Sequence, residues 1–429
     1  MNFYIETFGC KVNQYDSQEI IECMEKSGFN RTENSNDANI IIINSCTVTA
    51  SSDRKAKSTI RSYKKKNPSC ITVLCGCLPQ SKPDLYANYP DADIITGNKI
   101  NKDIPNLILS YMKNPAKSFV LPAHKTGDLY NGIGITRFDA HTRAFMKIQD
   151  GCDCFCSYCI IPYSRGRSRS RDLLSIKKEM EALSEFGYKE VSLVGINLSD
   201  YGRNTSYSLS DAVLLADDIK PIKRVRLGSL EPVFLTDAML DNLKKSEKLC
   251  NHFHVSLQSG SDKILKQMNR RYTGEEYITL CDKLRTLFPD CTLTTDIIVG
   301  FPGESEKDFQ DSVNLVKNVR FEKVHIFPYS KREGTKAALA KNQIPNAEKR
   351  RRSSLLLDVA TTLRSAAFKA QIGKNHKVLL EKPLHNGTFT GYTTNYFPVK
   401  VRGDNLRSGD IVNVMIHDTD YKYLYGNES

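Results

Sequence analysis

The sequence lacks any hydrophobic run long enough to cross a lipid bilayer. Its strongest aliphatic runs, such as residues 40–43, are far shorter than a membrane-spanning helix. The first ten residues carry Glu6 and no apolar segment of the kind found in secretory signal peptides. Long internal repeats and low-complexity segments are also missing. These absences argue against a membrane span and an export signal, so we expect a cytoplasmic protein with no membrane partner.

Cysteine is present in an odd number, thirteen, and many of the cysteines lie in tight clusters. In a chain without an export signal, this pattern favours metal ligation over disulfide bonds. Isolated cysteines are more often small buried residues, and we expect that role for five of them: Cys23, Cys70, Cys250, Cys281 and Cys291.

Basic residues outnumber acidic ones, giving a formal net charge of +12. This balance favours a polyanionic partner, usually nucleic acid, without distinguishing RNA from DNA. The basic residues concentrate at 64–66, at 165–171 and at 349–352. For any one of these segments, a solvated face is the simpler interpretation.

Three cysteines, Cys152, Cys156 and Cys159, form a CxxxCxxC run directly after a strand pattern at residues 145–149. Three thiolates leave one iron of a four-iron cluster without a protein ligand, whereas ferredoxin spacings supply four thiolates, one for each iron. An open iron can bind the amino and carboxylate groups of S-adenosylmethionine, which one electron then cleaves to a 5′-deoxyadenosyl radical. Zinc is the main alternative, but no fourth ligand follows at zinc-like spacing. The spacing resembles that of the radical S-adenosylmethionine superfamily.

The first ~110 residues alternate strand and helix patterns, which predicts an open parallel sheet. The predicted strands are residues 2–7, 40–44, 71–75 and 94–96. Cys10, Cys46 and Cys77 each fall just beyond the C-terminal end of one of the first three strands, where ligand sites form in such sheets. Topology therefore predicts a second three-cysteine site, for which Cys75 is an alternative ligand if its strand ends earlier.

The rest of the chain divides into a linker, a barrel and a small β domain. Residues 114–143 hold several prolines and glycines, as a linker should. Six strand patterns separated by helices follow, which predicts a partial (β/α)6 barrel with its site at the C-terminal strand ends. The strands are residues 145–149, 191–196, 225–230, 253–257, 293–299 and 323–328. A long helix at 347–371 leads to an all-β tail. The fold class is therefore α/β, with predicted domains at 1–113, 144–370 and 371–429.

The chain resembles the methylthiotransferases, radical S-adenosylmethionine enzymes that insert sulfur and methylate it. The motifs that carry this resemblance are Thr7–Ser17, Asn44–Thr49 and Gly76–Gln80, and the likeness covers nearly the whole length. It implies an auxiliary [4Fe-4S] cluster on the N-terminal cysteines and selects Cys77 over Cys75 by its Gly-Cys pair. The Asp-Gly-Cys lead-in likewise selects Cys152 over Cys154, an extra cysteine without an assigned role.

Within this family, the segment from Gly9 to Tyr15 resembles the branch that modifies N6-threonylcarbamoyladenosine beside the tRNA anticodon. The branch acting on isopentenyladenosine usually has Gln-Met-Asn after the cysteine, and the branch acting on a ribosomal-protein aspartate has Pro-Lys-Asn. Both branches remain alternatives. The tail resembles the RNA-binding TRAM module, whose OB-like barrel suits a phosphate-tracking surface.

The resemblance implies cofactors, partners and further site residues. One S-adenosylmethionine gives its methyl group to sulfur on the auxiliary cluster, and a second yields the radical that activates C2 of the adenine. A low-potential electron donor such as flavodoxin or ferredoxin and a sulfur source are also implied. The expected S-adenosylmethionine contacts at the strand ends are Gly195, Asn197, Glu231, Gln258, Asp296 and Phe327. The expected tRNA phosphate contacts are Arg165, Arg167, Arg169 and Arg171.

Two non-catalytic classes are alternatives to this enzyme: an iron-sulfur RNA-binding or electron-transfer protein, and a zinc-stabilised tRNA-binding protein. The open iron argues against the first, because carriers generally ligate their clusters fully. His252 and His254 alternate on one strand face, but no third metal ligand lies near them in the sequence, so we expect them to line the barrel or its core.

Overall fold

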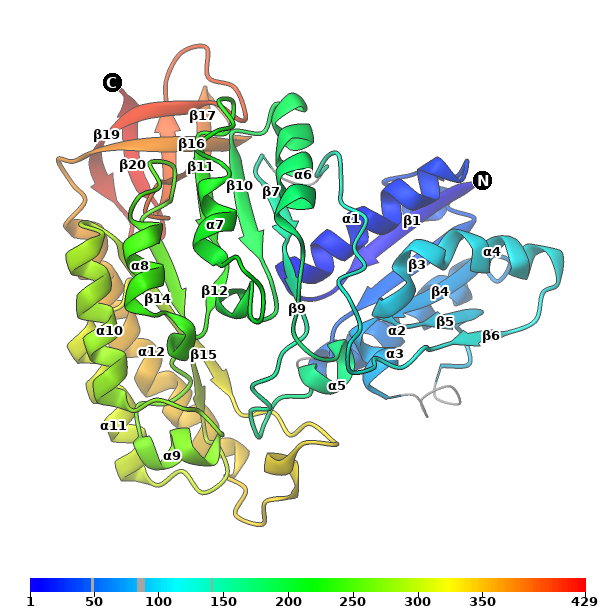
Figure 1. Ribbon diagram of the computed structural model, residues 1–429, viewed down its shortest axis with the longest axis horizontal. Coiled ribbons are helices and arrows are strands. Elements are labelled where there is room, and N and C mark those ends of the chain that lie inside the picture. Colours follow the sequence, from blue (N-terminus) through cyan, green and yellow to red (C-terminus); the bar gives the residue numbers. More distant parts are fainter. Residues whose placement is uncertain (48–49, 83–88, 140–141) are drawn as a thin grey trace. The chain divides into compact units, whose positions relative to one another are not determined.

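The computed structural model describes residues 1–47, 50–82, 89–139 and 142–429, which form two compact units (Figure 1). The first unit comprises Met1–Asp139, Lys147–Arg171 and Ser330–Ala338. The second comprises Ala140–Met146, Asp172–Tyr329 and Leu339–Ser429. The segment with the CxxxCxxC run thus packs with the N-terminal residues, so this partition differs from the predicted domains, which stay a prediction.

The first unit is built on a six-stranded sheet in the order β2-β1-β3-β4-β5-β6, in which neighbouring strands are parallel. Its strands are β1 (Asn2–Thr7), β2 (Asn30–Arg31), β3 (Ile40–Ser45), β4 (Ile71–Gly76), β5 (Ile94–Thr96) and β6 (Ser118–Val120). Its helices are α1 (Lys11–Lys26), α2 (Ala50–Lys66), α3 (Cys77–Ser81), α4 (Ile104–Lys113) and α5 (Ile161–Arg165). The predicted parallel sheet is confirmed, while β6 lies inside the predicted linker.

The aliphatic run of β3 explains why helices cover both faces of this sheet. Ile40 and Ile42 pack into one apolar core with residues of α1 and α4, whereas Ile41 and Ile43 pack into a second core with residues of α2. All six residues of β3 are buried, as expected for a central strand of a two-sided parallel sheet.

The second unit contains a parallel strand series that follows chain order. The two sheets are β11-β10-β7 and β12-β13-β14-β15, and only Gly228 separates β11 from β12. The strands are β7 (Ala144–Lys147), β10 (Glu190–Val194), β11 (Arg224–Leu227), β12 (Ser229–Leu230), β13 (His252–Val255), β14 (Thr292–Val299) and β15 (Lys323–Pro328). The helices are α6 (Leu173–Glu185), α7 (Leu209–Leu214), α8 (Asp237–Leu243), α9 (Asp262–Gln267), α10 (Gly274–Leu287), α11 (Glu306–Val319) and α12 (Asn346–Lys369). Figure 1 shows α10, α11 and α12 running alongside β14 and β15, as the predicted partial barrel requires.

The C-terminal residues form a closed five-stranded barrel in the order β16-β17-β18-β20-β19. Its strands are β16 (Asn375–Pro383), β17 (Thr388–Thr393), β18 (Pro398–Arg402), β19 (Ile411–Thr419) and β20 (Leu424–Glu428). Phe368 of α12 packs into its apolar core against Phe397. The predicted small all-β barrel is confirmed, although β20 was not among the predicted strands. Within the described part of the chain, no helix has the length and apolar character needed to cross a membrane.

Candidate active site

The N-terminal cysteines lie at the C-terminal ends of three neighbouring strands. Cys10 precedes α1 as its N-cap residue, Cys46 follows β3, and Cys77 opens α3 directly after β4. Because these strands are parallel and adjacent in the order β1-β3-β4, their ends meet at one edge of the sheet.

Asn13, one helical turn beyond Cys10, shows that the thiols converge. Its Oδ1 lies 3.9 Å from the Sγ of Cys10 and 3.7 Å from the Sγ of Cys77. Its Nδ2 donates to the backbone oxygens of Phe8 and Ser45 at 2.9 Å, which fixes the amide between β1 and β3. The structure therefore brings the thiols of Cys10 and Cys77 together. The i, i+3 spacing from Cys10 is the signal by which Asn13 could have been found.

Gly9 allows this convergence, because a side chain there would collide with Cys46. A Cβ on Gly9 would lie 2.8 Å from the Cβ of Cys46, and its φ of +119° suits glycine. Cys75, in contrast, is fully buried in an apolar core with its Sγ 3.5 Å from the backbone oxygen of Ile43. Burial raises the pKa of the Cys75 thiol. This geometry favours Cys77 over Cys75 as the site residue.

The second cysteine run lies on a loop closed by two short antiparallel strands, β8 (Gln149–Asp150) and β9 (Arg169–Ser170). Gly151 has a φ of +74°, and a Cβ there would lie 1.9 Å from the backbone oxygen of Arg167, so only glycine fits. The N–H of Cys152 donates to the oxygen of Gly166 at 3.1 Å, which closes the loop. Its three predicted ligands are half-buried: Cys152, Cys156 and Cys159.

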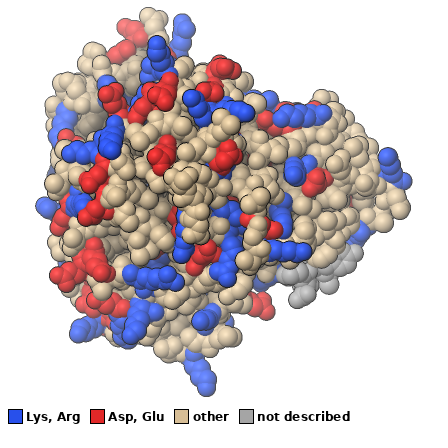
Figure 2. Space-filling model, viewed as in Figure 1, with Lys and Arg blue, Asp and Glu red and all other residues tan. Residues whose placement is uncertain are grey.

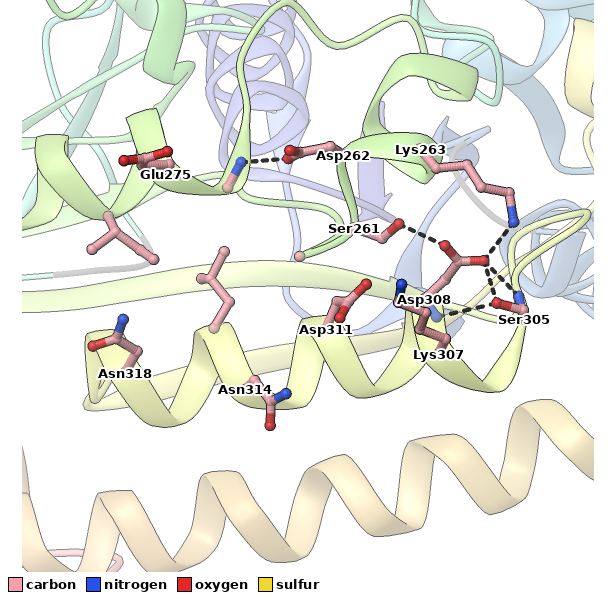
Figure 3. Close-up of a pocket in the computed structure, with 14 residues that line it drawn as sticks. Ser261, Asp262, Lys263, Glu275, Ser305, Lys307, Asp308, Asp311, Asn314 and Asn318 are labelled. Carbon is pink, nitrogen blue, oxygen red and sulfur yellow. Dashed lines mark hydrogen bonds and ion pairs between the residues drawn. The ribbon is translucent and has the colours of Figure 1, made fainter.

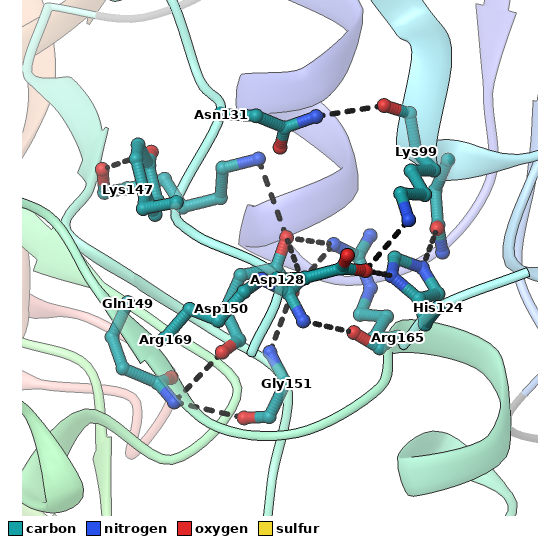
Figure 4. Close-up of polar contacts among 12 residues, drawn as sticks. Lys99, His124, Asp128, Asn131, Lys147, Gln149, Asp150, Gly151, Arg165 and Arg169 are labelled. Atoms are coloured by element: carbon teal, nitrogen blue, oxygen red, sulfur yellow. Dashed lines mark hydrogen bonds and ion pairs between the residues drawn. The ribbon is translucent and has the colours of Figure 1, made fainter. Parts of the chain in front are cut away.

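Arg165 links the two cysteine sites within the first unit. Its Nε lies 3.1 Å from the Sγ of Cys77, and its other nitrogens donate to Asp16 and Asn13 at 2.7 Å. It also donates to both carboxylate oxygens of Asp150 at 3.1 Å, directly before the loop glycine (Figure 4). The guanidinium is 1% exposed, so these bonds form in a low-dielectric interior.

Lys147 completes this buried charge network. It pairs with Asp16 and lies 3.5 Å from Asp150, the carboxylate that Arg165 also binds. Burial alone would raise the pKa of Asp150, but Arg165, Lys147 and Arg169 hold it well below its usual range. Asp16 and Asp150 lie within the Thr7–Ser17 motif and the Asp-Gly-Cys lead-in, but their pairing with Lys147 and Arg165 was not predicted, because local motifs do not report partners that the fold brings from distant segments.

The structure does not fit the expectation that the whole arginine run contacts tRNA phosphates. Arg165, Arg169 and Arg171 are buried, with side chains turned to Asp150, to backbone oxygens and to Tyr15. A buried guanidinium already bound to protein acceptors cannot reach a phosphate on the surface. Arg167, whose side chain is 53% exposed and stacks 4.6 Å from the ring centre of Phe155, is the member that suits this role.

The expected S-adenosylmethionine contacts lie at or near strand ends of the second unit. Asn197 receives a hydrogen bond from Ser199 at 3.2 Å, and the same hydroxyl donates to the backbone oxygen of Glu231. The Glu231 carboxylate pairs with Arg270 at 2.7 Å, although burial raises its pKa. The remaining predicted residues are Gly195 after β10, Gln258 with its N–H on the oxygen of Asp296, and Phe327, which is 45% exposed on β15. Their ligand roles remain predictions.

The histidines of β13 acquire partners that the sequence did not reveal. His252 and His254 both contact the hydroxyl of Thr294, at 3.1 and 2.9 Å. His254 Nε2 also lies 3.1 Å from Asp296, and His325 brings a third donor to this place. The expectation that these histidines line the barrel or its core is compatible with this placement, and the neighbouring groups come from β14 and β15, far from His254 in the sequence.

A separate groove lies between the first residues of α9 and α10 and the length of α11 (Figure 3). Its volume is about 620 Å³, and none of the predicted site residues lines it. Asp308 dominates its polar surface but is already bound by Ser261, Lys263 and Ser305. This groove is held together by its own contacts and adds nothing to the candidate site.

Three family models match consecutive parts of the chain. Residues 2–97 match the uncharacterised protein family UPF0004, residues 146–316 the radical SAM superfamily, and residues 369–427 the TRAM domain. The solved structure of the radical S-adenosylmethionine methyltransferase TsrM from Kitasatospora setae shares the fold, with a TM-score of 0.57 at 15% identity. That likeness covers 79% of this chain and 77% of TsrM. Fold and cysteine loop thus define a radical S-adenosylmethionine enzyme.

Whole-length relatives narrow the class. A tRNA-2-methylthio-N(6)-dimethylallyladenosine synthase of Clostridium tetani is 37% identical, over 99% of this chain and 96% of the relative. The threonylcarbamoyladenosine tRNA methylthiotransferase MtaB of Bacillus subtilis is 33% identical, over 98% and 94%. The chain belongs to the radical S-adenosylmethionine tRNA methylthiotransferases, and it is accordingly a transferase.

Membership of the superfamily implies a [4Fe-4S] cluster and S-adenosylmethionine, and the donor set fits. The loop offers soft thiols, which iron-sulfur clusters prefer, and they are half-buried. No disulfide joins any of the thirteen cysteines, all of which lie in the described residues. The thiols of the loop are therefore available as cluster ligands.

Proposed function

We propose that this protein converts N6-threonylcarbamoyladenosine beside the tRNA anticodon to its 2-methylthio derivative. The observation that carries the proposal is the convergence of Cys10 and Cys77 on Asn13, with Cys46 beside Gly9, in the segment that resembles the threonylcarbamoyladenosine branch. The soft thiol set supports a second [4Fe-4S] cluster there. The basic net charge of +12 supports a tRNA substrate and, with it, a cytoplasmic location.

The protein's own residues hold the reacting groups in place. The clusters, when bound, supply sulfur and the one-electron cleavage of S-adenosylmethionine, of which two molecules serve as methyl donor and radical source. Arg165 holds the Cys77 thiol and the loop carboxylate Asp150 at a fixed separation. Asn13 orients two thiols through one amide. A low-potential electron donor such as flavodoxin or ferredoxin and a separate sulfur source complete the proposed reaction.

The alternative substrate is dimethylallyladenosine in tRNA. The identity of 37% to the Clostridium tetani synthase, against 33% to MtaB, favours it. The difference is small over chains of this length. The short segment from Gly9 to Tyr15 lies at the candidate site and favours threonylcarbamoyladenosine.

One experiment decides between the two substrates. Reconstituted protein, dithionite and S-adenosylmethionine are incubated without oxygen with tRNA carrying either modification, and the digested nucleosides are identified by mass spectrometry. The proposal expects methylthiolation of the threonylcarbamoyl nucleoside alone. Product from the dimethylallyl nucleoside alone would overturn the substrate, and about four irons instead of about eight per chain would overturn the second cluster.

A further inference from the structure

One face of strands β13, β14 and β15 in the second unit is polar. We call the side chains on this face the polar lane; they are His254, Asp296, Lys323 and His325, with Phe327 at the end of β15. His254 of β13 pairs with Thr294 of β14, and Asp296 of β14 pairs with His325 of β15. Thr294 and Asp296 are two residues apart on one strand, so they lie on the same face, and their partners His254 and His325 lie on that face too. The opposite face is apolar: the ring centre of Phe253 lies 4.8 Å from that of Phe288, the residue that caps α10. The lane is therefore the polar face of these strands, turned away from this apolar packing.

The lane changes in character along β15. Phe327, near the strand's C-terminal end, is 45% exposed and offers a stacking surface. His325 precedes Phe327 by two residues, and Lys323 precedes His325 by two residues. Each step is about 7 Å along the strand. Lys323 is exposed at the N-terminal end of β15 and forms no ion pair with an acidic side chain among the described residues, so its ammonium is a cation available at that end of the lane.

Hydrogen bonds fix the proton on His254 and hold Asp296. An ionised carboxylate only accepts, so His254 Nε2, 3.1 Å from Asp296, must carry a proton. Nδ1 then accepts from the hydroxyl of Thr294 at 2.9 Å, and Thr294 in turn accepts from His252 at 3.1 Å. This series of hydrogen bonds leaves Nε2 of His254 without a lone pair for a metal ion. The possible ligand atoms of His254, Asp296 and His325 nevertheless lie within 4.8 Å of one another. A metal site is the less favoured use of these groups.

We infer that this lane binds the N6 substituent of the substrate and selects a threonylcarbamoyl group over a dimethylallyl group. The inference rests on the proposed function. In this inference Phe327 and Asp296 serve the tRNA substrate in place of the S-adenosylmethionine contacts that the sequence predicts for them. Phe327 provides the surface for the adenine ring, Asp296 accepts from the N–H and hydroxyl groups of the substituent, and His325 and Lys323 bind its carboxylate. His254 is a positioning residue, because it acts by holding Asp296.

The same chemistry explains the rejection of a dimethylallyl group. That group is a hydrocarbon, and its entry would strip water from Asp296, His325 and Lys323 without replacing the lost hydrogen bonds. A site that hydrogen-bonds its substrate discriminates strongly against an analogue without those groups. The lane thus provides a basis for selecting threonylcarbamoyladenosine over dimethylallyladenosine, a choice that the sequence identities to the relatives do not decide.

The test measures binding of anticodon stem-loop RNA to the reconstituted full-length protein by fluorescence anisotropy. Three RNAs of one sequence carry threonylcarbamoyladenosine, dimethylallyladenosine or adenosine. The wild-type protein is expected to bind the first about tenfold or more tightly than the others. Lys323→Met and Asp296→Asn are expected to lower this preference toward one, without weakening the binding of the unmodified RNA. Lys317→Met, which removes an exposed lysine from α11, is the matched control and keeps the preference.

Distinct outcomes separate this inference from the proposed function. If the wild-type protein methylthiolates threonylcarbamoyl-tRNA but Lys323→Met keeps the full preference, the lane does not bind the substituent. Lys323 is exposed, so this variant is not compromised by misfolding. One equivalent of zinc in the wild-type protein that Asp296→Asn and His325→Ala both lose would identify a metal site and overturn the assignment. Activity on dimethylallyl-tRNA alone would instead overturn the proposed function.

Discussion

The Nε of Arg165 lies 3.1 Å from the Sγ of Cys77, although 88 positions separate the two residues in the chain. Next to it, the hydroxyl of Ser164 donates to the backbone oxygen of Cys77 at 3.0 Å. Helix α5, which follows the cysteine run at residues 152–159, is therefore bonded to the start of α3, which carries Cys77. The relative placement of the two cysteine sets depends on this contact.

Replacement of Arg165 should destabilise the fold and disturb the auxiliary site. Arg165→Gln leaves Asp16 and Asp150 buried with less compensating charge, which we expect to cost about 3–5 kcal/mol in the free energy of unfolding. Arg165→Lys keeps the charge but cannot make all of the hydrogen bonds, so a smaller loss is expected. Urea denaturation measures both, with the exposed Arg167→Gln as control. Equal stability of Arg165→Gln and the control would contradict the buried network.

The two neighbouring cysteines of β4 and α3 should behave differently. Cys77→Ala is expected to remove the auxiliary cluster, about four irons per chain, whereas Cys75→Ala should keep it. The reason is the different contact of each thiol: Cys75 Sγ lies 3.5 Å from the backbone oxygen of Ile43 inside the apolar core, whereas Cys77 Sγ lies 3.7 Å from Asn13 Oδ1. Iron and sulfide analysis after anaerobic reconstitution measures the outcome. Iron loss in Cys75→Ala but not in Cys77→Ala would reverse the assignment.

Arg167 should contribute to tRNA binding without affecting the clusters. Figure 2 shows basic and acidic side chains interspersed on the face in view, so single exposed arginines matter more than one large patch. Arg167→Ala is expected to weaken tRNA binding for all sequences and to lower the slope of log K against log salt by about one. Filter binding at several salt concentrations measures this slope. An unchanged slope, or lost iron, would show that Arg167 has a structural role instead.

Glu322 should make stability depend on pH. Burial raises the pKa of this half-buried carboxyl to about 6, even though it accepts from the N–H of Leu293 at 2.6 Å. A folded-state pKa above the unfolded one favours folding at low pH, and this contribution disappears as the pH rises from about 4.5 through 6. Glu322→Gln should therefore stabilise the protein by about 1–2 kcal/mol at pH 7.5 and have little effect at pH 4.5. Urea denaturation at both pH values tests the sign, and an equal effect at both would refute it.

The sequence by itself determined the sheets and the positions of the cysteines. Residues 40–43 are aliphatic at every position, which suits a strand buried on both faces, and β3 occupies that place. The cysteine run at 152–159 and the placement of Cys10, Cys46 and Cys77 after strands follow from local spacing and parallel topology. Strand β6 was not predicted because it lies between Pro115 and Pro122, in a segment whose prolines and glycines indicate a linker.

Only the tertiary structure decided which charged residues face the site. The alternating arginines from 165 to 171 resemble an exposed basic run, yet three of the four are buried, because Asp16, Asp150 and backbone oxygens compensate them. Likewise, β14 and β15 bring Asp296 and His325 to His254 from distant positions. Periodicity reports which face of an element is apolar, whereas the partner of a buried charge is set by long-range packing that no local pattern encodes.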